Sequence, residues 1–244
     1  MISIGDACMN KIKLFCLAYS GATALIYYKL QKYLSERIEI VPIDLPGRGT
    51  RMDEKLLTMF DDSLIDVEEQ INKKLGGSSY YAVFGYSLGA VLAFEVIQRL
   101  SVSPLHLFLA ARQPPHVIDK DDKIAVLPDE QFLCRLISLG GMSPELLNDK
   151  RALEYYLPII RADFELVGSY EFNGMTRNID NNSTILFSQE DSCSERIMEW
   201  SKYLSGKCEY IKFKGDHFFI NREPEKIAEI ISAKINEEIE NLEI

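Results

Sequence analysis

Residues 81–96 read YAVFGYSLGAVLAFEV, and this stretch decides the fold. Its first four residues are apolar or aromatic, which predicts a buried strand, and the apolar run from Ala90 onward predicts a buried helix. Between them, residues 85–89 (GYSLG) have the form G-x-S-x-G, in which a serine occupies a sharp strand-to-helix turn. Glycines flank the serine because Cβ atoms there would collide in the strained turn. We therefore expect Ser87 to be a nucleophile.

Short apolar runs alternate with helical patterns along most of the chain. The strand candidates are Lys13–Leu17, Ile38–Ile43, Tyr81–Tyr86, Leu105–Ala110, Thr184–Ser188 and Glu209–Lys214. The helix candidates between them are Thr23–Leu34, Ser63–Leu75, Leu88–Leu100, Ile197–Leu204 and Pro224–Glu240. Such alternation predicts an α/β fold with a doubly wound parallel sheet, in a single domain over residues 1–244.

The alternation stops between Arg112 and Asn182. Helical patterns occur there at Asp129–Leu139, Pro144–Leu147 and Arg151–Val167, without a convincing strand. Long insertions of this kind tend to cover binding sites, so we expect a helical lid over the ends of the strands. A packed subdomain without a gating role is the alternative.

Composition excludes several classes of protein. The chain has 244 residues, 47% hydrophobic, with 27 basic against 37 acidic residues and a net charge of -10. Nucleic-acid surfaces need clustered Lys and Arg, so we expect no nucleic-acid partner, and the charge suits a soluble monomer. Five scattered cysteines without a C-x-x-C pair predict reduced thiols in a cytoplasmic protein, with neither a disulfide framework nor a metal site.

The segment from Met9 to Tyr28 imitates a signal peptide, because a basic start precedes an apolar stretch. Ser20 and Gly21 interrupt this stretch, which favours a buried strand, a turn and an amphipathic helix over export. No other segment has the length to span a bilayer, so we expect no membrane partner.

A serine nucleophile needs a base, and the chain has three histidines. His106 lies inside an apolar strand candidate, which is typical of a hydrogen-bonded core histidine. His116 comes too early, because the base of this serine motif follows the acid in the chain. His217 directly follows the last strand candidate, at the carboxyl edge of the expected sheet, so we expect it to be the base.

The acid of the triad is expected to be Asp191. It follows the strand candidate Thr184–Ser188 by three residues and gives the chain order Ser, Asp, His. Glu190 and Asp216 are competitors, and Asp216 ranks lower because neighbouring side chains on a backbone seldom face each other.

Acyl transfer also needs two N–H donors for the oxyanion, one from the residue after the nucleophile and one from the loop after the first strand. The sequence therefore predicts Leu88 and a residue within 18–22 as these donors.

Seven stretches together resemble the type II thioesterases of nonribosomal peptide and polyketide synthesis, which have the α/β-hydrolase fold. In chain order they are Leu14–Gly21, Asp44–Gly49, Gly85–Gly89, Leu127–Asp129, Leu139–Gly141, Asp191 and Gly215–Phe219. The chain departs from the family pattern at five positions. The family usually has Pro where this chain has Ala18, Ala where it has Ser20 and Gly where it has Ala22. It usually has His where this chain has Tyr86 and Gly where it has Ser188.

The resemblance implies an activity and a site. It implies a triad of Ser87, Asp191 and His217 and an oxyanion hole formed by Leu88 and Ser20. It also implies a helical lid over about residues 112–171, no cofactor, and hydrolysis of acyl or aminoacyl thioesters on the phosphopantetheine arm of carrier proteins, which restores mis-primed synthases.

Two other functions stay open from the sequence: a carboxylesterase or lipase that acts on small soluble esters, and a non-catalytic binding protein with the same fold. Two motifs are interpreted as structural. Asp62-Ser63-Leu64 resembles a phosphopantetheine attachment site but suits the acidic start of a helix. Cys193 is interpreted as a residue at the start of a helix.

Overall fold

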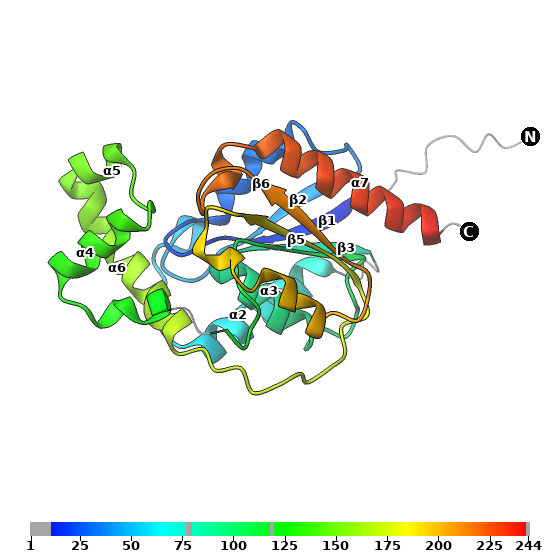
Figure 1. Cartoon of the computed structure of the whole chain (residues 1–244), viewed down its shortest axis with the longest axis horizontal. Coiled ribbons are helices and arrows are strands. Elements are labelled where there is room, and N and C mark those ends of the chain that lie inside the picture. The colour runs from blue at the N-terminus through cyan, green and yellow to red at the C-terminus, as the bar shows by residue number, and fades with distance from the viewer. Residues whose placement is uncertain (1–10, 77–79, 118–119, 243–244) are drawn as a thin grey trace, which may run out of the picture.

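The computed structural model describes residues 11–76, 80–117 and 120–242, and a six-stranded sheet runs through its centre (Figure 1). In chain order the strands are β1 (Ile12–Leu17), β2 (Ile38–Ile43), β3 (Tyr81–Tyr86), β4 (His106–Ala110), β5 (Asn182–Ser188) and β6 (Cys208–Phe213). Their order in the sheet is β2-β1-β3-β4-β5-β6, and every neighbouring pair is parallel. The predicted doubly wound parallel sheet is confirmed, and all six carboxyl ends lie at one edge.

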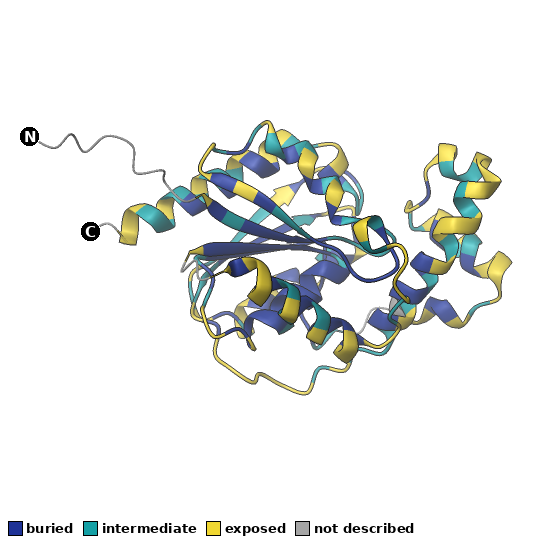
Figure 2. Cartoon of the chain, turned by 180° about the vertical axis from the view of Figure 1, so that it is seen from behind, coloured by how far each residue is buried: buried dark blue, intermediate teal, exposed yellow. Residues whose placement is uncertain are grey.

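Helices cover both faces of the sheet. On one face lie α2 (Phe60–Leu75) and α3 (Leu88–Ile97), and on the other lie α1 (Tyr28–Gln31) and α7 (Pro224–Leu242). Figure 2 shows buried residues concentrated in the middle of the sheet, where β1, β3 and β4 are almost fully buried. Strands covered on both sides favour apolar residues on both faces, which explains why β3, and β4 after His106, are continuous apolar runs instead of alternating ones.

Three helices lie between β4 and β5: α4 (Asp129–Ser138), α5 (Pro144–Asn148) and α6 (Lys150–Gly168). They project beyond the edge of the sheet (Figure 1) and share a small apolar cluster of their own. The last turns of α6, in contrast, pack into the main core through Leu166 and Val167. The insertion therefore has one end fixed to the body of the protein.

Two predicted helices differ from the structure. The expected helix Thr23–Leu34 is a 3₁₀ helix, Ala24–Tyr27, followed by the single turn of α1, and Ile197–Leu204 is a 3₁₀ helix over Ile197–Lys202. Tertiary hydrogen bonds compete with helical periodicity here, since the buried Tyr27 donates to the carbonyl of Leu17 at 2.7 Å. The other 3₁₀ helices are Gly49–Arg51, Lys120–Val126, Ser192–Ser194 and Phe219–Asn221.

The segment that imitates a signal peptide contributes β1, an interior strand of the sheet. Within the described ranges, no helix combines the length and the apolar character needed to cross a bilayer. Among the described residues, the cysteines Cys16, Cys134, Cys193 and Cys208 form no disulfide.

The apparent attachment motif at Ser63 is buried in α2. The sequence predicts a helix that begins at Ser63, after Asp61 and Asp62. In the structure the helix begins at Phe60, so both acidic residues lie inside its first turn. Acidic side chains in a first turn favourably oppose the helix dipole, which accounts for the motif without any attached group.

Candidate active site

Ser87 occupies a strained backbone position between β3 and α3. Its φ of 53° and ψ of -112° lie outside the common regions for a residue with a side chain. Its amide donates to the carbonyl of Ala110 at 2.8 Å, which ties the turn to the neighbouring strand β4. The predicted strand–turn–helix elbow is therefore present, and Ser87 is the N-cap of α3.

Both glycines of the motif are required by close backbone packing. A Cβ at Gly85 would lie 2.2 Å from the carbonyl oxygen of Gly89, and one at Gly89 would lie 2.1 Å from the carbonyl oxygen of Leu17. The amide of Gly89 donates to the carbonyl of Ala18 at 3.1 Å. The elbow is thus packed directly against β1 and the loop that follows it.

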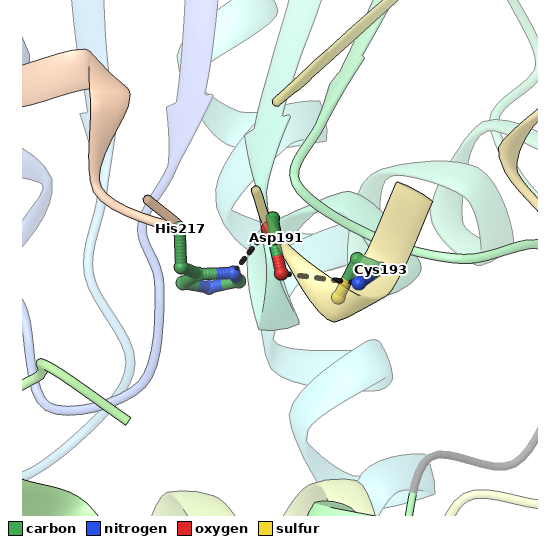
Figure 3. A group of neighbouring side chains, drawn as sticks. All are labelled: Asp191, Cys193 and His217. Carbon is green, nitrogen blue, oxygen red and sulfur yellow. Dashed lines mark hydrogen bonds and ion pairs between the residues drawn. The ribbon is translucent and has the colours of Figure 1, made fainter. Parts of the chain in front are cut away.

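His217 lies in the loop after β6, with its ring directed at Asp191 (Figure 3). Its Nδ1 lies 2.7 Å from Oδ2 of Asp191. The loop is also held from β3, because the hydroxyl of Tyr86 donates to the carbonyl of His217 at 2.6 Å. The imidazole is therefore fixed at its Nδ1 side and through its own backbone.

Asp191 follows β5 and is almost fully buried, with 7% of its surface exposed. Its Oδ1 accepts from the amide of Cys193 at 3.1 Å, which caps the 3₁₀ helix Ser192–Ser194 (Figure 3). Burial raises the pKa of Asp191, but the bond to His217, the charge of that ring and the amide of Cys193 outweigh burial and lower it overall. The carboxylate therefore stays ionised beside the imidazole.

The competing residues are bound elsewhere. Asp216 pairs with Arg222 at 2.6 Å and accepts from the amide of Phe218, whereas Glu190 accepts from the amide of Gly215. Of these three carboxylates, Asp191 is therefore the one that hydrogen-bonds His217.

The other two histidines also have partners outside this cluster. His106 is buried between Glu238 and Thr184, at 2.9 and 2.8 Å, as expected for a core histidine, and His116 lies 3.1 Å from Glu199.

A cavity of about 350 Å³ adjoins these side chains, with Ser87, Asp191 and His217 all on its wall. The other wall comes from the helical insertion and is mostly apolar. Its apolar side chains there are those of Leu136, Leu139, Met142, Ile160, Phe164 and Val167. The cavity can therefore hold an apolar group beside the serine hydroxyl.

The expected oxyanion residues, Leu88 and Ser20, line the same cavity. Leu88 is the first residue of α3, where amides are free of intrahelical partners. Ser20 lies in a tight turn in which the amide of Ala22 donates to the carbonyl of Tyr19 at 3.1 Å. The sheet thus brings all five predicted site residues to one place.

The link between Ser87 and His217 is not direct in this structure. The Ser87 hydroxyl has no hydrogen-bond partner among the described residues, although the side chains of Ser87 and His217 both line the cavity. Catalytic hydrogen bonds are often long without substrate and tighten when it binds.

One described group also has the donor types for a metal ion: Asp191, Cys193 and His217 place an oxygen, a sulfur and a nitrogen within 4.8 Å of one another. In the structure the carboxylate and the imidazole are instead bonded to each other.

Two sets of residues at the site were not predicted. In the sequence Tyr86 is only a departure from the family pattern, yet its hydroxyl donates a hydrogen bond to the carbonyl of His217. The ion pair between Arg48 and Asp163 lies beside the turn of Ser20. A charged residue on the otherwise apolar face formed by Ile159, Ile160 and Leu166 was the available sequence signal for Asp163.

Comparisons with known proteins agree with this geometry. The Thioesterase domain family model matches residues 12–235. The gramicidin S biosynthesis protein GrsT of Aneurinibacillus migulanus is 31% identical over 216 residues, which cover 86% of this chain and 83% of GrsT.

Solved structures are similar over nearly the whole length. ClbQ, from the colibactin NRPS/PKS pathway, superposes with a TM-score of 0.88 at 29% identity, covering 93% of this chain and 98% of ClbQ. The type II thioesterase BorB, from the borrelidin biosynthetic cluster, has a TM-score of 0.83 at 25% identity and covers 92% and 93%. With its parallel sheet, its serine elbow and these matches, the chain belongs to the thioesterase family of α/β-hydrolase enzymes.

Proposed function

We propose that this thioesterase hydrolyses acyl or aminoacyl thioesters from the phosphopantetheine arm of carrier proteins, with Ser87, His217 and Asp191 as its catalytic triad. The observation that carries the proposal is the 2.7 Å contact between His217 and Asp191, on the wall of the cavity that also contains the strained Ser87. An acid–base pair beside a serine in an elbow is the arrangement that activates a hydroxyl for acyl transfer.

The proposed reaction has two halves. His217 accepts the hydroxyl proton of Ser87 through Nε2, and the oxygen attacks the thioester carbonyl. The amides of Leu88 and Ser20 hold the oxyanion until the C–S bond breaks, and the thiolate takes the proton from His217. Water, deprotonated by His217, then attacks the acyl-enzyme; the bond between the acyl carbon and Oγ of Ser87 breaks, His217 returns the proton to Oγ, and the acid is released.

The choice of a carrier-bound substrate rests on the relatives and on the cavity. GrsT is named for gramicidin S biosynthesis, and ClbQ is named for an NRPS/PKS pathway. The chain covers most of the length of each. The apolar cavity wall of the insertion suits an acyl chain.

The remaining assignments belong to the same proposal. Residues 1–244 form one domain in which about residues 112–171 act as a lid over the cavity. The protein works as a monomer in the cytoplasm, without a resident metal or cofactor, and its partners are carrier domains and not nucleic acid or membranes.

The test compares one acyl group in two chemical settings. Hydrolysis of an acyl-loaded carrier protein and of the matching nitrophenyl ester is measured with wild type and with Ser87→Ala. We expect a higher kcat/KM for the carrier and loss of both activities in the variant. A clear preference for the oxygen ester would favour the esterase alternative. A wild type that neither turns over nor reacts with a fluorophosphonate would favour a binding protein.

A further inference from the structure

The buried carboxylate of Asp163 joins the helical insertion to the turn that contains Ser20 and forms an ion pair with Arg48. Arg48, in the loop after β2, places its Nη1 and Nη2 at 2.5 and 2.6 Å from the two carboxylate oxygens of Asp163 on α6. The side chains are 4% and 0% exposed. The same carboxylate accepts from the amide of Gly21 at 2.6 Å. One acidic side chain therefore connects three segments that are far apart in the sequence.

The turn around Ser20 has a definite geometry. Tyr19 and Ala22 are joined by a backbone hydrogen bond, and Gly21, at the third position, has a φ of 82°, which defines a type II turn. Type I and type II turns differ by rotation of the central peptide, here the one between Ser20 and Gly21. In the observed turn its N–H faces Asp163, whereas after rotation the carbonyl oxygen of Ser20 would face the carboxylate.

The same helix face packs on the turn and forms the cavity wall. A Cβ at Gly21 would lie 2.5 Å from Cγ1 of Ile160, one turn before Asp163. Ile160, Phe164 and Val167 line the cavity. The position of α6 therefore fixes both the turn and the space beside Ser87.

Stability alone is a weak explanation for the ion pair. Removing two charges from water costs several kcal/mol, and apolar residues of similar volume often serve as well or better in a core. What apolar residues cannot supply is an acceptor for the Gly21 amide. An ionised acceptor also makes a stronger hydrogen bond than a neutral one.

We propose that Asp163 is a positioning residue that holds the amide of Gly21, and with it the turn that carries the Ser20 amide, and that Arg48 orients its carboxylate. The inference rests on the proposed function in one respect: the amide of Ser20 is a donor to the oxyanion. Asp163 touches no reacting atom, so its loss weakens binding of the transition state more than binding of the substrate.

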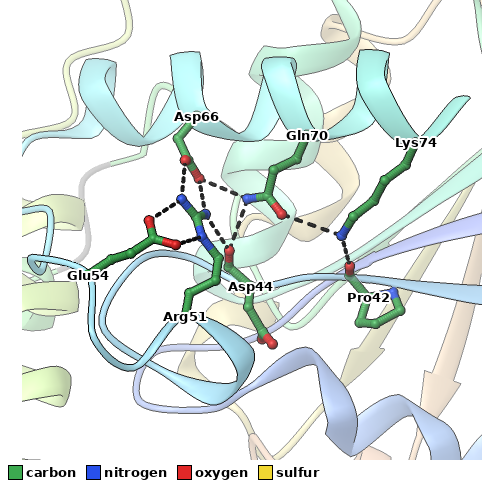
Figure 4. A network of polar contacts seen from close by, with 7 residues as sticks. All are labelled: Pro42, Asp44, Arg51, Glu54, Asp66, Gln70 and Lys74. Carbon is green, nitrogen blue, oxygen red and sulfur yellow. Dashed lines mark hydrogen bonds and ion pairs between the residues drawn. The ribbon is translucent and has the colours of Figure 1, made fainter. Parts of the chain in front are cut away.

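The test uses charge-balanced variants, because an unpaired buried charge could unfold the protein. Arg48→Met with Asp163→Leu removes both charges and the acceptor. Arg48→Met with Asp163→Asn restores a neutral acceptor for Gly21. The matched control is Arg51→Met with Asp66→Leu. It removes another ion pair, in which Arg51 makes two hydrogen bonds of 2.7 Å to Asp66 (Figure 4). This pair lies outside the cavity, in a neighbouring part of the chain.

We expect the first variant to keep a folded thermal transition and a KM within about twofold of wild type, with kcat lower by about 10- to 100-fold. Affinity for an alkyl trifluoromethyl ketone, which forms an oxyanion adduct with serine, should fall by a similar factor. Affinity for an amide-linked acyl pantetheine should not fall. The asparagine variant should recover part of the loss, and the control should match wild type.

Each outcome decides the inference. A folded leucine variant with unchanged kcat and ketone affinity would overturn it, as would equal losses in the leucine and asparagine variants or a change in KM alone. All rates are measured with the loaded carrier and with its nitrophenyl ester. A wild type that ignores carriers but cleaves the ester contradicts only the substrate class, whereas a wild type that does not bind the ketone contradicts both proposals.

Discussion

The proposed chemistry depends on the contact between Asp191 and His217. Of the three candidate acids in the described chain, Asp191, Glu190 and Asp216, Asp191 is the one that hydrogen-bonds the imidazole, and the amide of Cys193 holds its other oxygen. The chain order predicted this residue, but the contacts that exclude Asp216 and Glu190 come from loop geometry that no local pattern contains.

We predict that Asp191→Asn lowers kcat by about 10³- to 10⁴-fold with a small effect on KM, since the amide favours the wrong imidazole tautomer. Asp216→Asn is the control and should retain at least about half of the activity. Steady-state rates with a loaded carrier provide the measurement. Equal losses in the two variants would show that the assignment of the acid is wrong.

His106 should make stability depend on pH. Burial lowers its pKa below the ordinary 6.5, and the hydrogen bond to Glu238 opposes burial without overcoming it. As the pH falls through 6.5 the unfolded chain gains a proton that the folded protein does not, so the free energy of unfolding decreases by up to about 1.4 kcal/mol per pH unit.

The substitution His106→Gln keeps hydrogen-bonding capacity but does not titrate. Urea unfolding between about pH 7.5 and 5.5 should therefore give a steeper loss of stability in wild type than in this variant. Parallel curves would mean that His106 takes up its proton equally well in the folded state.

For helices and strands, the sequence predicts the features that follow from the burial pattern. It does not predict features that depend on contacts between distant parts of the chain. The predicted ends of all six strands agree with the structure within two residues, and the interior strand β3 is the clearest case because it is a continuous buried run. The 3₁₀ segments at Ala24–Tyr27 and Ile197–Lys202 were not distinguished from α-helix. Asp163 and Gly21 are 142 positions apart, so only the folded chain reveals their contact.

The elbow predicts a steric effect at its second glycine. Gly89→Ala would force a Cβ against the carbonyl of Leu17, so we expect a loss of about 2 to 3 kcal/mol in the free energy of unfolding. Gly141→Ala is the control, because the nearest atom would be a ring carbon of Phe218 at 3.4 Å. Denaturant titration measures both, and a Gly89→Ala variant as stable as its control would contradict the packing of α3 against β1.

The whole molecule combines a rigid sheet with a helical insertion, and the cavity lies where the two meet. The side chains of the proposed triad come from the carboxyl edge of the sheet, whereas the apolar wall comes from α4, α6 and the segment between α4 and α5. Under the proposed function, the sheet provides the chemistry and the insertion selects the acyl group.

We therefore predict that Met142→Trp, which narrows the cavity from the insertion side, discriminates by chain length. The ratio of kcat/KM for an octanoyl carrier to that for an acetyl carrier should fall by about tenfold or more, since each buried methylene is worth about 0.8 kcal/mol. Met198→Trp is the control, because Met198 is exposed and outside the cavity. An unchanged ratio would place the acyl chain elsewhere.

The central claim is that the acyl group passes through the hydroxyl of Ser87. A rapidly quenched single turnover with an acyl-loaded carrier, followed by intact-mass and peptide mass spectrometry, tests it most directly. We expect a transient adduct with the mass of the acyl group on the peptide that contains Ser87, and none in Ser87→Ala. Turnover without an adduct, or an adduct on another residue such as Cys193, would contradict it.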